Sequence, residues 1–384
     1  MTKIFIGSSV HLWNDPRILH KEGLSLARRY EVELHIPAEF DHRKYKGIDI
    51  YGLPLWQEKS DRLAIIWEIA RRLFRTDAHI VHLHDPELLP LALLIKLLTS
   101  KIVVFDFHEE YSRKFANRNW IPDYIAGIIA AGFNILEGIA CRTFNGVIGV
   151  IDRQEQVLKY CQNYAIVKNY PVLDSTIQNF SFRGTGSEKR LYNLVYLGDI
   201  IEERGIERIV KVAGGVAKHC SITLDLIGPV KEKEYGEFLR DTIEELGIGE
   251  QVRFHGYLLI EEAMEILSKG DLGFMSFQVP RLFVPALPVK MFDYMTAGLP
   301  VIMPKYSYAK SVVEGHNCGI VVDSMNISET VDNIVYLLEN PELRRRLGKN
   351  GREAVLKNYS WKTQEVKLLG LYEKMLGNVE RGCS

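Results

Sequence analysis

Short apolar runs alternate with amphipathic stretches along almost the whole chain. In the first half, the apolar runs are KIFIGSS, EVELHIP, AHIVHLH and KIVVFDFH, and the stretches between them repeat apolar residues at helical spacing. Near-continuous apolar runs of this kind are typical of strands buried on both faces of a parallel sheet. The pattern therefore predicts alternating strands and helices, the organisation of a doubly wound α/β fold.

The same pattern restarts in the second half, with the runs YNLVYLG, ITLDLIGP, VRFHGYL, DLGFMSF and PVIMP. We therefore expect two tandem Rossmann-like domains, residues 1–169 and 170–361, joined near Asn169. The last helical stretch, residues 362–384, has no strand after it and is expected to pack back onto the first domain. Ligands of such sheets bind at the carboxyl ends of the strands, so we expect a cleft between the two halves.

Length, charge and cysteine content narrow the class of protein. A chain of 384 residues suits two domains. The net charge of −1 gives no electrostatic case for nucleic acid. Five scattered cysteines without a CxxC pair argue against a disulfide framework and a structural zinc site. The first apolar run is too short for a signal peptide, and YIAGIIAAGFNILEGIACRTF is interrupted by polar residues, so we expect a buried helix and a cytoplasmic protein.

Two strand-to-helix turns in the second half are candidates for binding phosphate. Neither a Walker loop nor a GxGxxG motif is present. In YLGDIIEERGIER, Arg204 opens a helix after a strand; in ALPVKMFDYMTAGLPVI, Leu287 and Pro288 precede Lys290. A lysine in the first turn of a helix opposes the helix dipole, which an anionic ligand would offset. Asp293 could accept hydrogen bonds from a diol such as ribose, or simply pair with Lys290 three residues earlier.

These motifs resemble a known family. ALPVKMFDYMTAGLPVI is similar to the C-terminal donor-site signature of GT-B glycosyltransferases, in particular the large retaining group called family 4. YLGDIIEERGIERIV resembles its strand–loop–helix that grips the donor diphosphate. SSVHLWNDPRILHKEGLSLARRYEVELH, VHLHDPELLPLALLIK, VVFDFHEEY and KNYP resemble the first domain and linker of a bacterial branch active in polysaccharide biosynthesis. The resemblance covers essentially the whole chain.

The resemblance implies a metal-independent enzyme that transfers a hexose-type sugar, with retention, from a UDP- or GDP-sugar to a glycan or glycolipid acceptor. Basic side chains and helix dipoles would neutralise the leaving diphosphate, so no metal or cofactor is expected. The resemblance implies that Arg204 and Lys290 bind the diphosphate and that Asp293 binds the ribose. It implies that Gly256 and Tyr257 contact the base. In the first domain, His108 and Glu109 would contact the sugar and the acceptor, and Asp15 and Arg17 would line the cleft.

Two positions depart from the family pattern, which usually has two glutamates seven residues apart. Asp293 replaces the second, and Pro285 stands at the first, where a glutamate would hydrogen-bond a sugar hydroxyl. A degenerate, non-catalytic sugar-binding or scaffold protein is therefore an alternative function. A nucleotide-sugar epimerase is another, although it would need more acid–base residues than the motifs supply.

Two further patterns have competing interpretations. HIVHLHDPE offers His79, His82, His84 and Asp85 as metal ligands, but no further carboxylate or cysteine spacing supports a metal, and Asp85-Pro86 is expected to cap the next helix. Arg71, Arg72 and Arg75 beside Trp67 form either a peripheral membrane contact for a lipid-linked acceptor or a solvated helix face, and we favour the latter. One sequence does not predict the acceptor or the oligomeric state.

Overall fold

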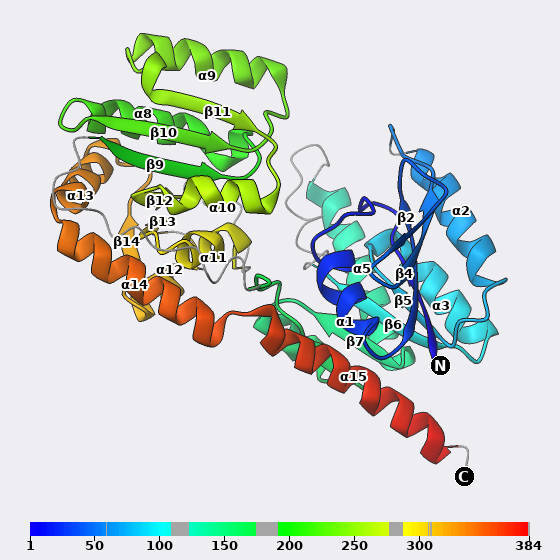
Figure 1. Ribbon diagram of the computed structural model, residues 1–384. Helices are drawn as coiled ribbons and strands as arrows, with labels where there is room; N and C mark the ends of the chain where they lie inside the picture. Colours follow the sequence, from blue (N-terminus) through cyan, green and yellow to red (C-terminus); the bar gives the residue numbers. More distant parts are fainter. Residues whose placement is uncertain are drawn as a thin grey trace. The chain divides into compact units, whose positions relative to one another are not determined.

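The structure, a computed structural model, describes residues 1–58, 60–108, 123–173, 191–275, 287–305, 307 and 309–382. Within this part the chain forms two compact units: Met1–Asn169 with Trp361–Ser384, and Tyr170–Ser360. We call them unit 1 and unit 2. Each contains a mainly parallel sheet with helices on both faces, which confirms the prediction of two Rossmann-like domains (Figure 1).

Unit 1 is built on an eight-stranded sheet in the order β3-β4-β2-β1-β5-β6-β7-β8, in which β3 and β4 are antiparallel and all other neighbours are parallel. The strands are β1 (Lys3–Gly7), β2 (Glu31–Pro37), β3 (His42–Tyr45), β4 (Ile48–Leu53), β5 (Ile80–Leu83), β6 (Ile102–Phe107), β7 (Gly146–Gly149) and β8 (Tyr164–Ile166). The helices and helical turns are η1 (Ile18–Gly23), α1 (Leu24–Leu26), α2 (Asp61–Leu73), η2 (Pro86–Leu88), α3 (Leu89–Leu98), α5 (Asp123–Thr143), η3 (Asp152–Gln154), α6 (Glu155–Leu158) and α15 (Trp361–Gly382).

Unit 2 has a six-stranded, fully parallel sheet in the order β11-β10-β9-β12-β13-β14. Its strands are β9 (Tyr192–Leu197), β10 (Ile222–Ile227), β11 (Val252–Gly256), β12 (Leu272–Phe274), β13 (Val301–Pro304) and β14 (Gly319–Val322). Its helices and turns are η4 (Glu202–Arg204), α8 (Ile206–Ala217), α9 (Lys233–Glu245), η5 (Gly249–Gln251), α10 (Ile260–Ser268), α11 (Val289–Thr296), α12 (Lys310–Gly315), α13 (Ile327–Glu339) and α14 (Pro341–Asn358).

Apolar side chains fill both faces of each sheet, because the central strands are buried along their whole length. In unit 2, residues of α8, α9 and α13 form one cluster with the sheet, and residues of α10, α11, α12 and α14 form another. In unit 1, α2, α3 and α5 cover one face. The other face packs against η1 and α15.

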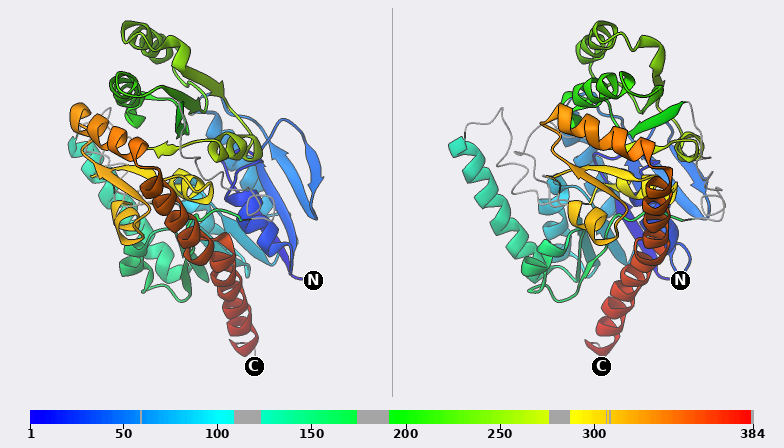
Figure 2. Two further views of the ribbon diagram at one scale, coloured as in Figure 1. Left: turned by 60° about the vertical axis from the view of Figure 1, so that its left-hand side comes forward. Right: turned by 90° about the vertical axis from the view of Figure 1, so that its left-hand side faces the viewer.

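Helix α15 joins unit 1 although the whole of unit 2 precedes it in sequence. Leu368 and Tyr372 are fully buried in the cluster that contains Ile18 and Leu19 of η1. Arg28 also pairs with Glu365 at 2.8 Å. The views show α15 in red beside the blue turn η1 and helix α1 (Figures 1 and 2). In the described part of the chain, no helix combines the length and apolarity that crossing a bilayer requires.

Three local features differ from the sequence expectations. Helix α5, expected to be buried, leaves Ile128, Ile135 and Ile139 exposed by 70%, 64% and 45%. The stretch after the first strand, expected to be one amphipathic helix, forms the π-helical turn η1 followed by the short helix α1. Strand β3, with the sequence HRKY, was not predicted because its side chains are mainly exposed and carry no apolar alternation. It occupies the edge of the sheet, where charged residues are common.

Candidate functional site

Three glycines form the carboxyl edge of the central strands of unit 2. Gly198, Gly228 and Gly256 follow or end β9, β10 and β11, and all three have positive φ, at 131°, 140° and 67°. The amide of Gly198 donates to the carbonyl of Ile227, and that of Gly228 donates to the carbonyl of Gly256, each at 2.8 Å. A Cβ on Gly228 would lie 2.1 Å from the carbonyl oxygen of Gly198. Only glycine permits this close backbone approach.

Lys290 extends from the first turn of α11 to this glycine edge. Its Nζ donates to the Tyr196 hydroxyl at 3.1 Å and lies 4.3 Å from the centre of the Tyr196 ring. A Cβ on Gly198 would approach Nζ to 2.6 Å, so the missing side chain makes room for the ammonium group. Burial, together with the positive charge of Arg204, lowers the pKa of Lys290 to about 7, against partial compensation from Asp199 and Asp293.

Arg204 and Asp293 belong to the same electrostatic group as Lys290. Arg204 ends η4 after β9, and Gly205 then adopts the left-handed conformation at φ 62° before α8 begins. The guanidinium lowers the pKa of Lys290, which places two cations near one strand end. Such a pair repels itself unless an anion lies nearby. The structure thus brings together three predicted donor residues: Arg204, Lys290 and Asp293.

The remaining predicted donor residues lie around this group or outside it. Pro288 is the N-cap of α11 and has an extended backbone. Leu287 packs against the apolar cluster that α10, α11, α12 and α14 form with the sheet. Gly256 lies two strands from β9, and the Tyr257 side chain beside it is 70% exposed. Pro285 lies outside the described residues.

In unit 1, histidines and carboxylates meet at the carboxyl ends of β1, β5 and β6. His11 contacts Asp15 Oδ2 through Nδ1 at 2.9 Å and Asp85 Oδ1 through Nε2 at 3.3 Å. Burial alone would lower the pKa of His11, but hydrogen bonds to the two carboxylates raise it to about 10. The ring therefore carries a positive charge at neutral pH. His11 was not among the predicted residues, because a single histidine after a strand carries no sequence signal.

Asp85 connects the loops after β1 and β5. Its Oδ2 accepts hydrogen bonds from the Ser8 hydroxyl at 2.7 Å and from the Ser9 amide at 2.8 Å. Its backbone has φ 68°, an uncommon conformation for a residue with a side chain, which is typical of functional loops. Asp85 is the N-cap of η2 and Pro86 begins that turn, as predicted, but the Asp85 side chain makes no capping hydrogen bond.

His108 follows β6 and lies beside these groups. Its Nε2 is 2.6 Å from Nδ1 of His84 and 3.5 Å from Oδ2 of Asp106, and its ring centre lies 5.3 Å from that of His11. Burial lowers the pKa of His108, so the ring is neutral at pH 7. Its side chain is 12% exposed. Glu109, its predicted partner, lies outside the described residues.

Asp15 and Arg17 occupy different environments. Asp15 is on the loop after β1, where its carboxylate accepts from the amides of Arg17 and Ile18 as well as pairing with His11. Arg17 is 4% exposed, and its guanidinium donates to Asp106 and to the carbonyl of Val167. The sequence analysis expected the Arg17 side chain to line the cleft, but its guanidinium group is buried inside unit 1. The need of buried Asp106 for a cation explains this position.

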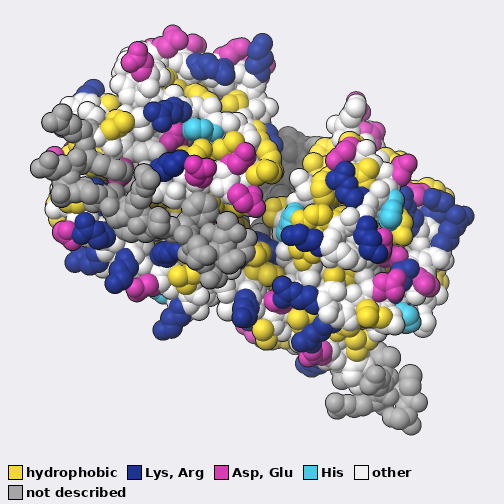
Figure 3. All heavy atoms as spheres, in the orientation of Figure 1, with side chains coloured by type: hydrophobic (Ala, Val, Ile, Leu, Met, Phe, Trp, Pro, Cys, Tyr) yellow, Lys and Arg dark blue, Asp and Glu magenta, His cyan; other side chains and the backbone are white. Residues whose placement is uncertain are grey.

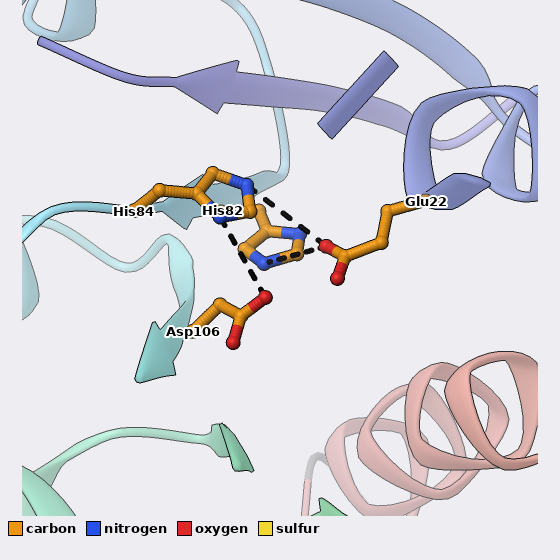
Figure 4. Close-up of side chains that lie close together, drawn as sticks. All are labelled: Glu22, His82, His84 and Asp106. Carbon is orange, nitrogen blue, oxygen red and sulfur yellow. Dashed lines mark ion pairs between the residues drawn. The ribbon is translucent and has the colours of Figure 1, made fainter. Parts of the chain in front are cut away.

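The alternative metal ligands from the sequence separate in space. His79 lies at the start of the β5 segment, 3.5 Å from the Lys3 amide, and Asp85 faces Ser8. His82 and His84 share one side of β5, where they face Glu22 and Asp106 instead (Figure 4). These carboxylates lie far from the histidines in sequence, so spacing could not reveal them.

Glu68 offsets part of the positive charge of the basic patch formed by Arg71, Arg72 and Arg75. Glu68 pairs with Arg71 at 2.6 Å and with Arg72 at 2.8 Å, and these hydrogen bonds hold the pKa of Glu68 at about 2. Arg72 also donates to the carbonyl of Gly52. Over the visible face of the molecule, basic and acidic side chains are interspersed (Figure 3). These pairs favour the interpretation of a solvated helix face.

Comparison with known proteins shows which proteins this chain resembles. Residues 178–354 match the family model described as "Glycosyl transferases group 1". The chain is 24% identical over 185 residues to the alpha-D-kanosaminyltransferase of Streptomyces kanamyceticus, covering 47% of this chain and 45% of the relative. It is 26% identical over 178 residues to a GDP-mannose-dependent phosphatidylinositol monomannoside mannosyltransferase of Mycobacterium tuberculosis, covering 46% of each. The chain thus spans about half the length of these curated relatives.

Solved structures match over nearly the whole length. Sucrose-phosphate synthase from Thermosynechococcus elongatus superposes with a TM-score of 0.75 at 15% identity, covering 98% of this chain and 100% of that one. Anabaena HepE, solved in complex with UDP and glucose, superposes with a TM-score of 0.68 at 12% identity, covering 97% and 100%. At these identities the likeness establishes the shared fold.

Proposed function

Because this chain has the GT-B fold and carries a glycosyl transferases group 1 domain at residues 178–354, we propose that it is a retaining glycosyltransferase that uses a nucleoside-diphosphate sugar. The observation that carries the proposal is that Lys290 lies at the glycine edge of unit 2, close enough to Arg204 for its positive charge to lower the pKa of Lys290. Two cations at the carboxyl end of a parallel sheet, one with a pKa lowered to about 7, form a site that an anion would stabilise.

A diphosphate fits this arrangement better than a single phosphate. Arg204 and Lys290 approach from two different strand-to-helix turns, and the backbone at Gly198 leaves space next to Nζ. Asp293, on the same helix as Lys290, is suited to accept hydrogen bonds from ribose hydroxyls. The positive charges of Arg204 and Lys290 would stabilise the departing diphosphate, so the proposal needs no metal at this position.

The proposed reaction exchanges one C–O bond for another. The bond from the anomeric carbon to the leaving phosphate oxygen breaks, a bond to an acceptor hydroxyl forms, and the hydroxyl proton passes to the leaving phosphate. Alignment and charge stabilisation then account for catalysis. We propose that His108 of unit 1 orients a sugar hydroxyl, a role supported by its neutral ring and by the 12% exposure of its side chain. The acceptor is a glycan or glycolipid.

Nucleotide binding tests the donor site directly. Thermal unfolding would be followed with UDP, GDP, ADP and CMP for the wild type, for Lys290→Met and for Lys310→Met, a matched control on the exposed helix α12. One nucleoside diphosphate should stabilise the wild type and the control by about 2.7 kcal/mol at a hundred times its dissociation constant. The Lys290 variant should lose this response.

A second assay separates an enzyme from a scaffold. The wild type should slowly hydrolyse the selected nucleotide sugar in the absence of acceptor, and His108→Ala should lower that rate much more than it weakens nucleotide binding. Nucleotide binding without any turnover would instead favour the non-catalytic alternative, and no response to any nucleotide would refute the donor site.

A further inference from the structure

A group of four buried side chains lies within unit 1. It consists of Glu22 from η1, His82 from β5, His84 directly after β5, and Asp106 from β6. All four are fully buried, with 0% of each residue exposed. One ligand-type atom from each lies within 4.8 Å of the others, and the side chains converge from three elements (Figure 4).

Three atoms at the centre of this group have no hydrogen-bond partner: Nε2 of His82, Nε2 of His84, and Oε2 of Glu22. Oε2 lies 3.7 Å from Nε2 of His82 and 4.0 Å from Nε2 of His84, too far for a hydrogen bond. Buried polar atoms without partners are rare and costly. A ligand bound between them would satisfy all three atoms.

The outer nitrogens of both histidines are engaged elsewhere. Nδ1 of His82 is 2.8 Å from the Tyr372 hydroxyl, and Nδ1 of His84 is 2.6 Å from Nε2 of His108. When each Nδ1 carries the proton and donates it outward, both Nε2 atoms present lone pairs toward the carboxylate. Outward hydrogen bonds of this kind orient histidines that bind a metal.

Arg17 holds the two carboxylates from the side. Its Nη2 lies 2.9 Å from Glu22 Oε1 and 2.9 Å from Asp106 Oδ2. Two ionised carboxylates against one guanidinium would leave one negative charge in excess, which either a bound cation or a proton shared between Glu22 and Asp106 would balance. Because Arg17 contacts Oε1 of Glu22, Oε2 remains directed at the histidines.

We propose that Glu22, His82, His84 and Asp106 bind a divalent transition metal ion of the zinc class. Two imidazole nitrogens and two carboxylate oxygens are typical ligands for Zn²⁺, and four protein ligands make a closed, structural site. Zinc bonds of about 2.1 Å place tetrahedral ligands about 3.4 Å apart, so small side-chain movements close the present spacing. Imidazole ligands disfavour the hard cations Mg²⁺ and Ca²⁺.

The site connects elements that are distant in sequence. Tyr372 belongs to α15 and contacts His82, and Glu22 belongs to η1, on which α15 packs. A bound ion would therefore connect turn η1 with strands β5 and β6 and, through Tyr372, with helix α15. The proposed ion requires no residue of unit 2, but within unit 1 its ligand His84 contacts His108, with 2.6 Å from Nδ1 to Nε2.

The test uses full-length protein freed of metal with a chelator and lacking any affinity tag. Cobalt(II) is added and visible absorption recorded, and zinc uptake is measured by equilibrium dialysis. We expect one ion per chain, tetrahedral cobalt bands and a higher melting temperature with zinc. Glu22→Gln and His84→Gln should weaken zinc binding more than tenfold, whereas His79→Gln, outside the group but next to β5, should bind like the wild type.

Fold integrity of unit 1 is checked in the same samples by circular dichroism and by the cooperativity of thermal unfolding without metal. Absence of both cobalt bands and stoichiometric zinc uptake in the wild type would overturn the proposal and leave a shared proton between Glu22 and Asp106. Equal binding by the wild type and a folded Glu22→Gln variant would also overturn it, because the ion would then lie elsewhere. If that variant does not fold, X-ray absorption of the cobalt-loaded wild type decides, with two imidazole ligands supporting the site and none refuting it.

Discussion

At the scale of single residues, the most informative group is the ammonium of Lys290. Its environment, at the glycine edge and close to Arg204, lowers its pKa to about 7. A lysine held this way stays charged only when an anion compensates for burial and for the neighbouring cation. This dependence can be measured as a pH effect on ligand affinity.

Nucleoside diphosphate affinity should fall as pH rises from 7 to 9. Below the pKa of about 7, Lys290 is already protonated; above it, the free protein must take up a proton to bind, which costs up to tenfold per pH unit. Isothermal titration in buffers of different ionisation enthalpy would detect this proton uptake. Lys290→Arg should show a flatter profile because arginine stays charged. An identical slope in both proteins would contradict the assignment.

Gly198→Ala should weaken nucleotide binding without unfolding the protein. The new Cβ would lie 2.6 Å from Nζ of Lys290, and φ of 131° adds strain of about 1–3 kcal/mol. Gly247→Ala is the matched control, since φ is 67° there and nothing lies within 4 Å of the added carbon. Calorimetric titration with UDP should show a larger loss for Gly198→Ala; equal affinities would argue against a role of the glycine edge.

Residue-level prediction was most specific where chemistry and position coincide in a motif. Arg204, Lys290 and Asp293 occur in recognisable strand-to-helix turns, and the charges of Arg204 and Asp293 act on Lys290; their binding of a donor stays a prediction. Gly228 was missed because its own stretch, LIGP, does not distinguish it among the 30 glycines of the chain. Its role depends on the neighbouring strand. Arg17 was expected at a surface, but the buried carboxylate that holds it, Asp106, is 89 residues away.

At the scale of elements, α15 determines the stability of unit 1. Leu368→Ala should destabilise it by about 2–5 kcal/mol, the range for fully buried leucines. Val366→Ala, at a side chain that is 70% exposed on the same helix, should change stability little. Denaturant unfolding monitored by tryptophan fluorescence would compare the two variants. Similar midpoints for both would show that α15 is not part of the cooperative core.

Element prediction depended on burial. The doubly buried strands β5, β6, β9 and β10 appear in the sequence as apolar runs, so their existence followed from composition alone. Strand β3 and turn η1 did not follow, because an exposed edge strand and a π-helical turn have no periodic signature. The packing of α15 on unit 1, by contrast, was expected, because no strand follows this helix in the sequence.

At the scale of the whole molecule, the two units should respond to different ligands. Differential scanning calorimetry of the full chain should show UDP raising the transition of unit 2, while Leu368→Ala lowers that of unit 1. Because the two changes affect separate cores, their effects should add. A single transition that responds equally to both would show that the units unfold as one.

The position of α15 also has a consequence for synthesis on the ribosome. The 191 residues from Tyr170 to Ser360 are translated between the two parts of unit 1. At about 5–20 residues per second, the N-terminal sheet waits on the order of 10–40 s with the face that α15 covers still exposed. During that interval the nascent chain presents Ile18 and Leu19 to the cytosol, which makes this surface a natural target for chaperones that bind apolar segments.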